Sequence, residues 1–299
     1  MLAAASVALG GAFAVTASAE TVEVKGGWAV WGVKESFRTY IGGAGEITLS
    51  GGATENEDGT YRFPIASGTL DTETGLGEVQ ATGSVNFFAH GGALNITVAN
   101  PRVVLAPTGA KLYADAQSVP MGGGDPIDDN RDLVNLDVEA VDPEFGPTTI
   151  EWSSIPATLA ENGVPVFGRY PAETTMDPVS VVAGFGETPG LKVVGQARLG
   201  KRAKAAVAKV RCKTGPCEVA APKRTKIRVG KRQFKAKVKA PDRVGDGKRA
   251  QIVVQVTKRV AKKLAGRKGT VKFDLWVGAG PGAEVDTTVK TTLVGARAR

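Results

Sequence analysis

Short stretches of alternating apolar and polar residues, separated by glycine-rich turns, recur through most of the chain. In "QFKAKVKA" (233–240), Phe234, Ala236 and Val238 alternate with lysines, and "TVKFDLWVG" (270–278) alternates in the same way. Successive side chains of a strand point to opposite faces, so a period of two predicts strands with one buried face. The 39 glycines and 16 prolines supply many turns. The chain is therefore predicted to be mainly β, with short helices.

Charge divides the chain into two parts. Residues 1–194 hold 9 Lys or Arg and 24 Asp or Glu, a net charge of −15, whereas residues 195–299 hold 29 and 6, a net charge of +23. This asymmetry indicates two domains with different surroundings. We expect a first β domain over 22–186, a linker over 187–202 and a basic domain over 203–295. About seven short strands in the basic domain predict an immunoglobulin-like β-sandwich.

The strands are placed by alternation and turn signals. In the first domain they are expected at 46–51, 61–70, 77–90, 93–98, 102–106, 111–118, 133–140, 150–153 and the end of 170–185. An acidic loop is expected at 120–131, and a short helix and turn at 155–168. In the second domain strands are expected at 205–211, 218–220, 225–229, 233–240, 250–257, 270–278 and 284–293, with a crossover helix within 257–266.

The chain begins with an apolar run of small residues from Leu2 to Ala17, followed by "SAE". Ala17 and Ala19 stand at the small-residue positions of a signal-peptidase site, which predicts a secretory signal peptide over 1–19. No Lys or Arg precedes the run, and an N-terminal membrane anchor is the alternative. No other segment is expected to cross a bilayer. We therefore expect a secreted or extracellular protein, without a transmembrane segment after cleavage.

The two cysteines lie close together in "CKTGPC". In an exported protein, this spacing predicts a disulfide between Cys212 and Cys217 that closes a small turn. A metal site would need two more ligands, and the single histidine, His90, is far away in the sequence.

A short helix is predicted at "KESFRTYIGG" (34–43). Val33, Ser36, Phe37 and Tyr40 recur at i, i+3, i+4 and i+7, so we expect them to share one inward face. The glycine pair 42–43 is expected to end the helix.

No catalytic set is visible. His90, in the glycine turn of "NFFAHGG" (86–92), would have to serve as the base of a triad, and no GxSxG segment supplies a nucleophile. The acidic "DPIDDN" (125–130) lacks the spacing of an EF-hand loop, which disfavours calcium. We expect a binding protein rather than an enzyme, with His90 free to hydrogen bond to a polar group nearby.

Five segments, in order along the chain, resemble the HtaA family. They are "WGVKESFRTYIGG", "FPIASGTLDTETGLGEVQATGSVNFFAHGGAL", "NPRVVL", "LYADAQS" and "FGRYPAETTMDPVSV", and they cover most of residues 27–182. The resemblance implies a surface or secreted haem-binding module of high-GC Gram-positive bacteria, used in haem-iron acquisition. It also implies a mainly β fold in which short helices flank the haem pocket.

The resemblance further implies that ferric haem b is held by a tyrosine phenolate with a histidine hydrogen-bonded to it. Carried over to this chain, Tyr40 would be the iron ligand, His90 its partner and Ser36 a pocket residue that bonds a propionate. An anionic oxygen prefers ferric to ferrous iron, which suits capture outside the cell.

The same resemblance places aromatic residues around the macrocycle. Phe167 and Tyr170 of "FGRY" match the family's later aromatic pair, with Phe185 as a competing candidate. Further candidates for the apolar walls are Trp31, Val33, Phe37, Phe87 and Phe88, and candidates for propionate donors are Ser36, Lys34, Arg38 and Arg102.

The expected partners are haem or haemoproteins for the first domain and anionic cell-wall polymers or membrane headgroups for residues 203–295. The basic domain has a second interpretation, as a solvated structural module. Nucleic acid is not expected, because no aromatic platforms lie between the basic residues. The alternatives to a secreted haem-binding protein are a structural or adhesive wall protein without haem and, more distantly, a carbohydrate-binding sandwich.

Overall fold

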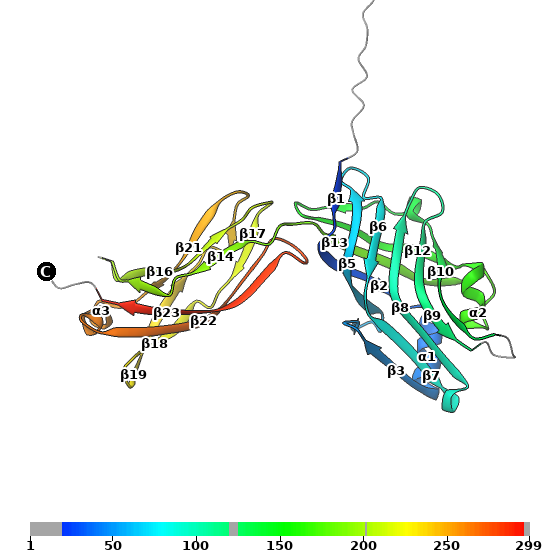
Figure 1. Cartoon of the computed structure of the whole chain (residues 1–299), viewed down its shortest axis with the longest axis horizontal. Helices are drawn as coiled ribbons and strands as arrows, with labels where there is room; N and C mark the ends of the chain where they lie inside the picture. The colour runs from blue at the N-terminus through cyan, green and yellow to red at the C-terminus, as the bar shows by residue number, and fades with distance from the viewer. Residues whose placement is uncertain (1–19, 120–124, 201, 296–299) are drawn as a thin grey trace, which may run out of the picture.

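The computed structural model of the protein describes residues 20–119, 125–200 and 202–295 (Figure 1). As predicted, the chain is mainly β: it forms two sheets, each with its own hydrophobic core, and a few short helices. The signal peptide expected over 1–19 lies outside the described residues. Among the residues that are described, no helix is long and apolar enough to span a membrane.

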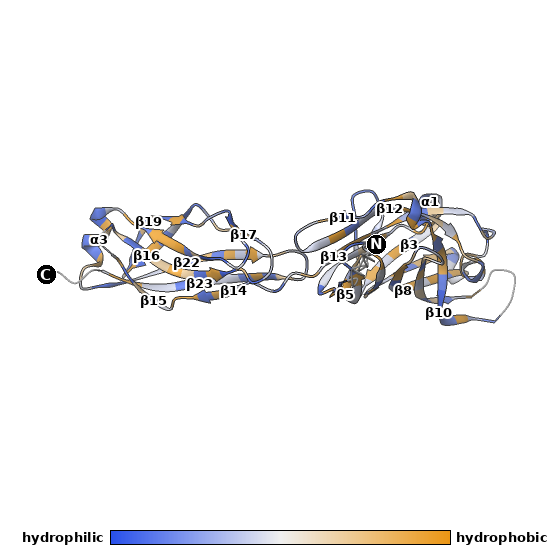
Figure 2. Ribbon diagram, turned by 90° about the horizontal axis from the view of Figure 1, so that it is seen from above, coloured by the Kyte–Doolittle hydropathy of each residue, from blue (hydrophilic) through white to orange (hydrophobic). Residues whose placement is uncertain are grey.

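The strands of the first domain alternate between buried apolar and exposed polar residues, as the hydropathy colours of Figure 2 show. They are β1 (Thr21–Glu23), β2 (Gly26–Trp31), β3 (Gly45–Ser50), β4 (Thr54–Glu55), β5 (Tyr61–Asp71), β6 (Gly77–Ala81), β7 (Ser84–Ala89), β8 (Leu94–Leu105), β9 (Lys111–Ser118), β10 (Ile127–Leu136), β11 (Glu144–Phe145), β12 (Thr149–Leu159) and β13 (Thr175–Gly184). The helical segments are α1 (Glu35–Ala44), α2 (Val164–Phe167) and the short 3-10 turns η1 (His90–Gly92), η2 (Val138–Ala140) and η3 (Glu161–Gly163).

The first sheet closes on itself. From β5 the antiparallel pairings run through β2, β13, β12, β10, β9, β8 and β6 and return to β5. Strand β8 changes its neighbour halfway: residues 94–99 pair with β7, whereas residues 102–105 pair with β6. Asn100, between these halves, has a φ of 49° and receives a hydrogen bond from the Gly83 N–H. As a result, β7 and its partner β3 extend beyond the closed ring, and α1 packs against them (Figure 1).

Several boundaries differ from the predictions. The strand expected at 77–90 is two strands, because β6 and β7 pair with different parts of β8 on either side of Gly83. An acidic loop was expected over 120–131, and this prediction is wrong from Ile127 onward, because β10 begins there and pairs with β9; Gln117 also donates a hydrogen bond to Asp128. Residues 120–124 lie outside the described residues. Of the short helix and turn expected at 155–168, residues 155–159 are instead the end of β12, and the helical part is limited to η3 and α2.

The second domain is also a β-sheet structure. Its strands are β14 (Gly190–Val193), β15 (Gln196–Arg198), β16 (Lys204–Arg211), β17 (Cys217–Ala220), β18 (Arg224–Val229), β19 (Arg232–Lys239), β20 (Arg243–Val244), β21 (Arg249–Gln255), β22 (Lys268–Gly278) and β23 (Glu284–Val294), with the crossover helix α3 (Lys258–Leu264). The segment 187–202, expected to be a linker, instead supplies β14 and β15, which pair with β16 and β23. The immunoglobulin-like assignment stays a prediction.

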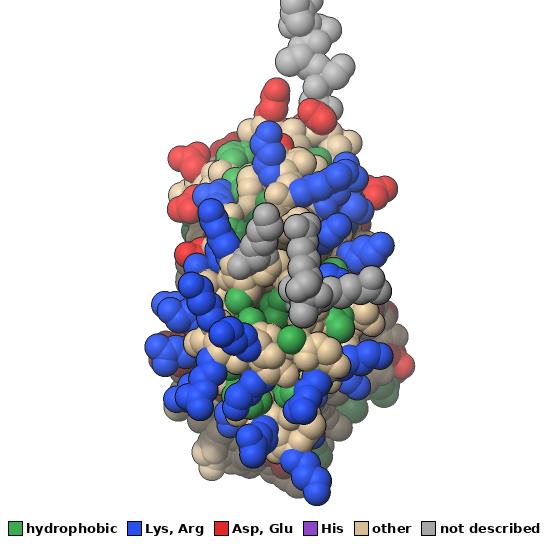
Figure 3. Space-filling view, turned by 90° about the vertical axis from the view of Figure 1, so that its left-hand side faces the viewer, with side chains coloured by type: hydrophobic (Ala, Val, Ile, Leu, Met, Phe, Trp, Pro, Cys, Tyr) green, Lys and Arg blue, Asp and Glu red, His purple; other side chains and the backbone are tan. Residues whose placement is uncertain are grey.

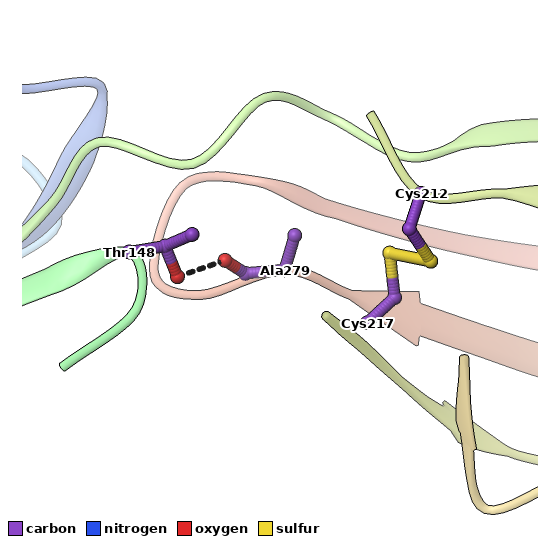
Figure 4. Close-up of a disulfide and its surroundings, with 4 residues drawn as sticks. All are labelled: Thr148, Cys212, Cys217 and Ala279. Carbon is purple, nitrogen blue, oxygen red and sulfur yellow. Dashed lines mark hydrogen bonds between the residues drawn. A yellow bond between two sulfur atoms is a disulfide. The ribbon is translucent and has the colours of Figure 1, made fainter. Parts of the chain in front are cut away.

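The predicted disulfide is present. Cys212 and Cys217 are both buried and bonded to each other, with their Cα atoms 5.8 Å apart (Figure 4). They close the turn between β16 and β17 at the end of the second domain that meets the first.

The two domains touch through the turn between β22 and β23. The buried Thr148 hydroxyl of the first domain donates a hydrogen bond to the Ala279 carbonyl of that turn (Figure 4). Backbones also approach closely, since a Cβ added at Gly26 would lie 2.4 Å from the Gly282 Cα. Only glycine permits such an approach. The junction is therefore built from backbone contacts that a single methyl group would disturb.

We predict that Gly26→Ala opens this junction, because the added Cβ collides with backbone rather than with a flexible side chain. Small-angle scattering should show a longer and broader distribution of interdomain distances than the wild type. Gly195→Ala is the matched control, because a Cβ at Gly195 meets nothing within 4 Å. A Gly26→Ala protein with the scattering profile of the wild type would show that the contact does not hold the domains together.

Candidate functional site

The start of α1 is held by one side chain of β13. The Asp177 carboxylate accepts a hydrogen bond from the Glu35 N–H at 3.0 Å and forms an ion pair with Arg38. The backbone of Asp177 also takes part: its N–H donates to the Val33 carbonyl, and its carbonyl accepts a hydrogen bond from the Trp31 indole at 3.1 Å. Asp177 thereby caps a helix whose own N-cap residue makes no side-chain capping bond.

The end of α1 leads directly into the sheet. The glycine pair 42–43 does not end the helix as expected; α1 continues to Ala44, and Gly45 is already the first residue of β3. Gly45 faces Ala89 of β7, and a Cβ at Gly45 would lie 1.9 Å from the Phe88 carbonyl oxygen. The close pairing of these two positions brings the last turn of α1 beside His90, the residue that follows Ala89.

Tyr40 and His90 meet at this point. The Tyr40 hydroxyl lies 2.5 Å from His90 Nε2, and the two ring centroids are 5.6 Å apart. Tyr40 is 41% exposed, and His90 is exposed as well. His90 has a φ of 54°, in the left-handed region that non-glycine residues rarely adopt. Strained backbone of this kind is often found at functional sites, where the rest of the fold holds it in place.

The prediction that Tyr40 points inward is wrong. Phe37 and Ile41, four residues apart, form the buried stripe of α1, and Phe37 packs against Phe87 with 5.0 Å between ring centroids. Ser36 and Tyr40, also four residues apart, form the neighbouring stripe, which is exposed. The two stripes are offset by a single residue. The predicted set 33, 36, 37 and 40 therefore combines buried positions (33 and 37) with exposed ones (36 and 40).

Tyr61 shows what burial does to the same side chain. It is fully buried, its hydroxyl is a buried side-chain atom without a hydrogen-bond partner, and desolvation raises its pKa to about 12. A phenol of this kind stays neutral and is closed to a ligand. Tyr40, by contrast, has an exposed side chain and an imidazole beside its hydroxyl.

The aromatic candidates are divided between the core and the surface. Phe167 is buried against Trp31 and Phe37, with ring centroids 6.4 and 6.0 Å apart, and its assignment to the haem pocket stays a prediction. Val33 and Phe87 are core residues too. Tyr170 is partly exposed, and Lys34 lies 5.9 Å from its ring while donating to the Thr175 carbonyl.

Other candidates have structural partners. Phe185 lies at the domain junction, where its N–H donates to the Thr148 carbonyl. Arg38 is engaged by Asp177 and the Gly32 carbonyl, which leaves it in a structural role. Arg102 pairs with Glu78 and stacks on Tyr113 at 4.1 Å. Of the predicted propionate donors, Ser36 is therefore the exposed one on the stripe of Tyr40.

Sequence reasoning missed Asp177 and Gly45. Asp177 lies 142 residues from the helix N–H that it caps, so no local pattern connects the two. Gly45 looks like an ordinary turn glycine until the register with Ala89 is known. In the part of the chain that the structure describes, no group of three or more His, Cys, Asp or Glu side chains could hold a metal ion.

We predict that Asp177→Ala destabilises the start of α1. Loss of a charged hydrogen-bonding partner should lower the free energy of unfolding by about 2 kcal/mol, measured by urea unfolding followed by tryptophan fluorescence. Asp129→Ala, which removes a more exposed carboxylate from the pair with Arg131, should cost less than about 1 kcal/mol. Equal costs for the two variants would contradict the anchoring role of Asp177.

Comparison with known protein families and solved structures identifies the first domain, which contains Tyr40 and His90. The HtaA family model ("Htaa") matches residues 26–182. Among solved structures, the chain is similar to the C-terminal domain of HtaA from Corynebacterium glutamicum, with 29% identity over 55% of this chain and 99% of that chain and a TM-score of 0.49. It is similar to the N-terminal domain of the same protein, with 25% identity over 55% and 99% and a TM-score of 0.47.

A third similar structure is the heme binding protein HtaB from Corynebacterium glutamicum, with 20% identity over 55% of this chain and 95% of that chain and a TM-score of 0.40. The curated proteins contain no match. Because the family model covers more than half of the 299 residues, the chain belongs to the HtaA family.

Proposed function

We propose that the first domain binds ferric haem b, with Tyr40 as the iron ligand and His90 as the hydrogen-bond partner of that ligand. The observation that carries this proposal is the Tyr40–His90 hydrogen bond, formed between two exposed side chains on a rigidly anchored helix and turn. Membership of the HtaA family supports haem as the ligand. Haem capture for iron acquisition would be the purpose of the site.

The chemistry of the pair suits an iron(III) ligand. A free phenol titrates near pH 10 and is mostly neutral at pH 7, so it needs help to act as a phenolate. An imidazole within hydrogen-bond distance can accept the phenol proton and then donate from Nε2 to the anionic oxygen. A phenolate in turn favours ferric over ferrous iron. His90 would therefore set both the protonation and the orientation of Tyr40.

The helix surface beside Tyr40 is exposed and free of close contacts at Gly43. At helical spacing, Ser36, Tyr40 and Gly43 share one exposed stripe of α1. A Cβ added at Gly43 would meet nothing within 4 Å. Ser36, one turn before Tyr40, would donate to a propionate. Glycine in a helix costs stability relative to alanine, and no close contact with the residues that the structure describes requires glycine at position 43.

Secretion and attachment to the cell surface complete the proposal. An extracellular chain would meet haem in its oxidised form, which a phenolate prefers. The second domain, with its excess of Lys and Arg, would hold the protein near the cell by binding anionic wall polymers. Haem or haemoproteins would be the partners of the first domain.

The test is a titration of the full chain with hemin, followed in the Soret region. We expect a 1:1 complex, severe loss of affinity for Tyr40→Phe, which removes only the oxygen, and a loss of about 10–100-fold for His90→Gly. Glycine is chosen at position 90 because it tolerates the positive φ.

Tyr113→Phe is the matched control, because that tyrosine lies under Arg102 rather than beside a histidine. Absence of a 1:1 complex in the wild type would refute haem binding and favour a structural or adhesive wall protein. A Tyr40→Phe protein that binds hemin as well as Tyr113→Phe does would refute Tyr40 as the ligand.

The open stripe makes a second prediction. Gly43→Ala places a methyl group on the stripe of Tyr40, whereas Gly42→Ala places one on another side of the same helix turn. Both changes should stabilise the free protein, by up to about 1 kcal/mol, because alanine favours helix. Only Gly43→Ala should weaken hemin binding. Equal hemin affinities for the two variants would show that the glycine at position 43 does not serve the ligand.

A further inference from the structure

The hairpin of β18 and β19 places like charges directly opposite each other. Arg224 faces Lys237, and Lys226 faces Lys235 across the two strands. Like charges in this position destabilise a sheet. Among the described residues, none of these four side chains forms an ion pair. The arrangement therefore has a cost that no ion pair among the described residues offsets.

Three of these cations border a hollow on the surface. A hollow of about 360 Å³ lies beside the hairpin, lined by Arg224, Lys235 and Lys237 together with Gln255 and Thr257. Gln255 is on β21, paired with Lys237, and Thr257 follows that strand. Ala236 and Val256 complete the lining, so the hollow has an apolar part as well as an arginine, two lysines, a glutamine and a threonine. The head groups of the two lysines and the arginine would supply the donors for the oxygens of a phosphate group.

The cations around the hollow continue over the domain. Figure 3 shows the end of the molecule formed by the second domain, where Lys and Arg side chains cover much of the visible surface. Lys272 and Lys290 form a further like-charge pair across β22 and β23; they are not part of the lining of the hollow, although β22 is paired with β18. A ligand with many negative charges would therefore find cations both in the hollow and beyond it.

We propose that this hollow binds phosphate groups of a linear polyanion. The inference rests on the proposed attachment to anionic polymers and gives that attachment a place and a chemistry. A hollow bordered by cationic residues suits a chain that can enter it, whereas a flat bilayer surface cannot. The exposed large hydrophobic residues of the described chain, Tyr40, Val119 and Phe145, are all in the first domain, so the second presents no such residue for insertion into lipid.

The experiment compares two double variants of the full chain that each remove two cations facing each other across a hairpin. Arg224→Gln with Lys237→Gln removes a pair that lines the hollow, and Lys272→Gln with Lys290→Gln removes a pair on the neighbouring hairpin that does not line it. The probe is sodium polyphosphate of defined length, with inorganic phosphate as competitor and phosphatidylglycerol vesicles as a second arm. We expect about tenfold weaker polyphosphate binding for the hollow variant, less than about threefold for the control, and weakening of wild-type binding by salt.

The possible outcomes distinguish the hollow, a diffuse electrostatic attachment and a membrane as the binding site or partner. Equal losses in the two variants would overturn the hollow as the site, while a diffuse electrostatic attachment would stand. Absence of wild-type binding to polyphosphate would contradict both the hollow and the attachment, and binding to vesicles alone would replace the polymer with a membrane. Thermal unfolding of both variants, expected to be unchanged or raised because like-charge repulsion is relieved, and an unchanged hemin titration would show that each protein is folded.

Discussion

The hydrogen bond between Tyr40 and His90 depends on where β3 and β7 meet. Because Gly45 faces Ala89, the end of α1 and the turn at His90 emerge side by side from the same edge of the sheet. A side chain at position 45 would force the two backbones apart, since its Cβ would lie within 1.9 Å of a carbonyl oxygen. The other end of α1 is held on β13 by Asp177. The phenol and the imidazole are thus positioned by two contacts that carry none of the chemistry.

In helix α1, the residues that stabilise the fold and the residues proposed to bind the ligand lie on two adjacent stripes. Phe37 and Ile41 fill the core, whereas Ser36 and Tyr40 face outward. The contrast with Tyr61 shows why this matters: a phenol in the core has its pKa raised to about 12 by desolvation and cannot be approached by a ligand. Exposure, a neighbouring imidazole and an open helix surface are the conditions that make Tyr40 available.

Much of the fold was predictable from the sequence, because apolar and polar residues alternate along strands that have one buried face. Strand β9 was predicted at 111–118, where the structure has it. Tyr40 and His90 came from segments resembling a known family, and the fold brings them together. The direction of Tyr40 was mispredicted because positions 36 and 37 differ by one residue yet lie on different faces. Asp177 could not be found locally, and β14 and β15 were too short to show alternation.

The burial of Phe167 could not be predicted from its motif, since an aromatic residue in a motif is equally suited to a ligand pocket and to a core. Only the structure shows it packed on Trp31 and Phe37. The second domain adds a different kind of information, because its charge was readable from the sequence whereas the pairing of like charges across β18 and β19 required the register.

The most direct measurement is a crystal structure of the full chain with hemin bound. We expect the iron to be bonded to the Tyr40 hydroxyl oxygen, with His90 Nε2 still within hydrogen-bond distance of that oxygen. Iron bonded to any other side chain, or Tyr40 turned away from the porphyrin, would contradict the central claim.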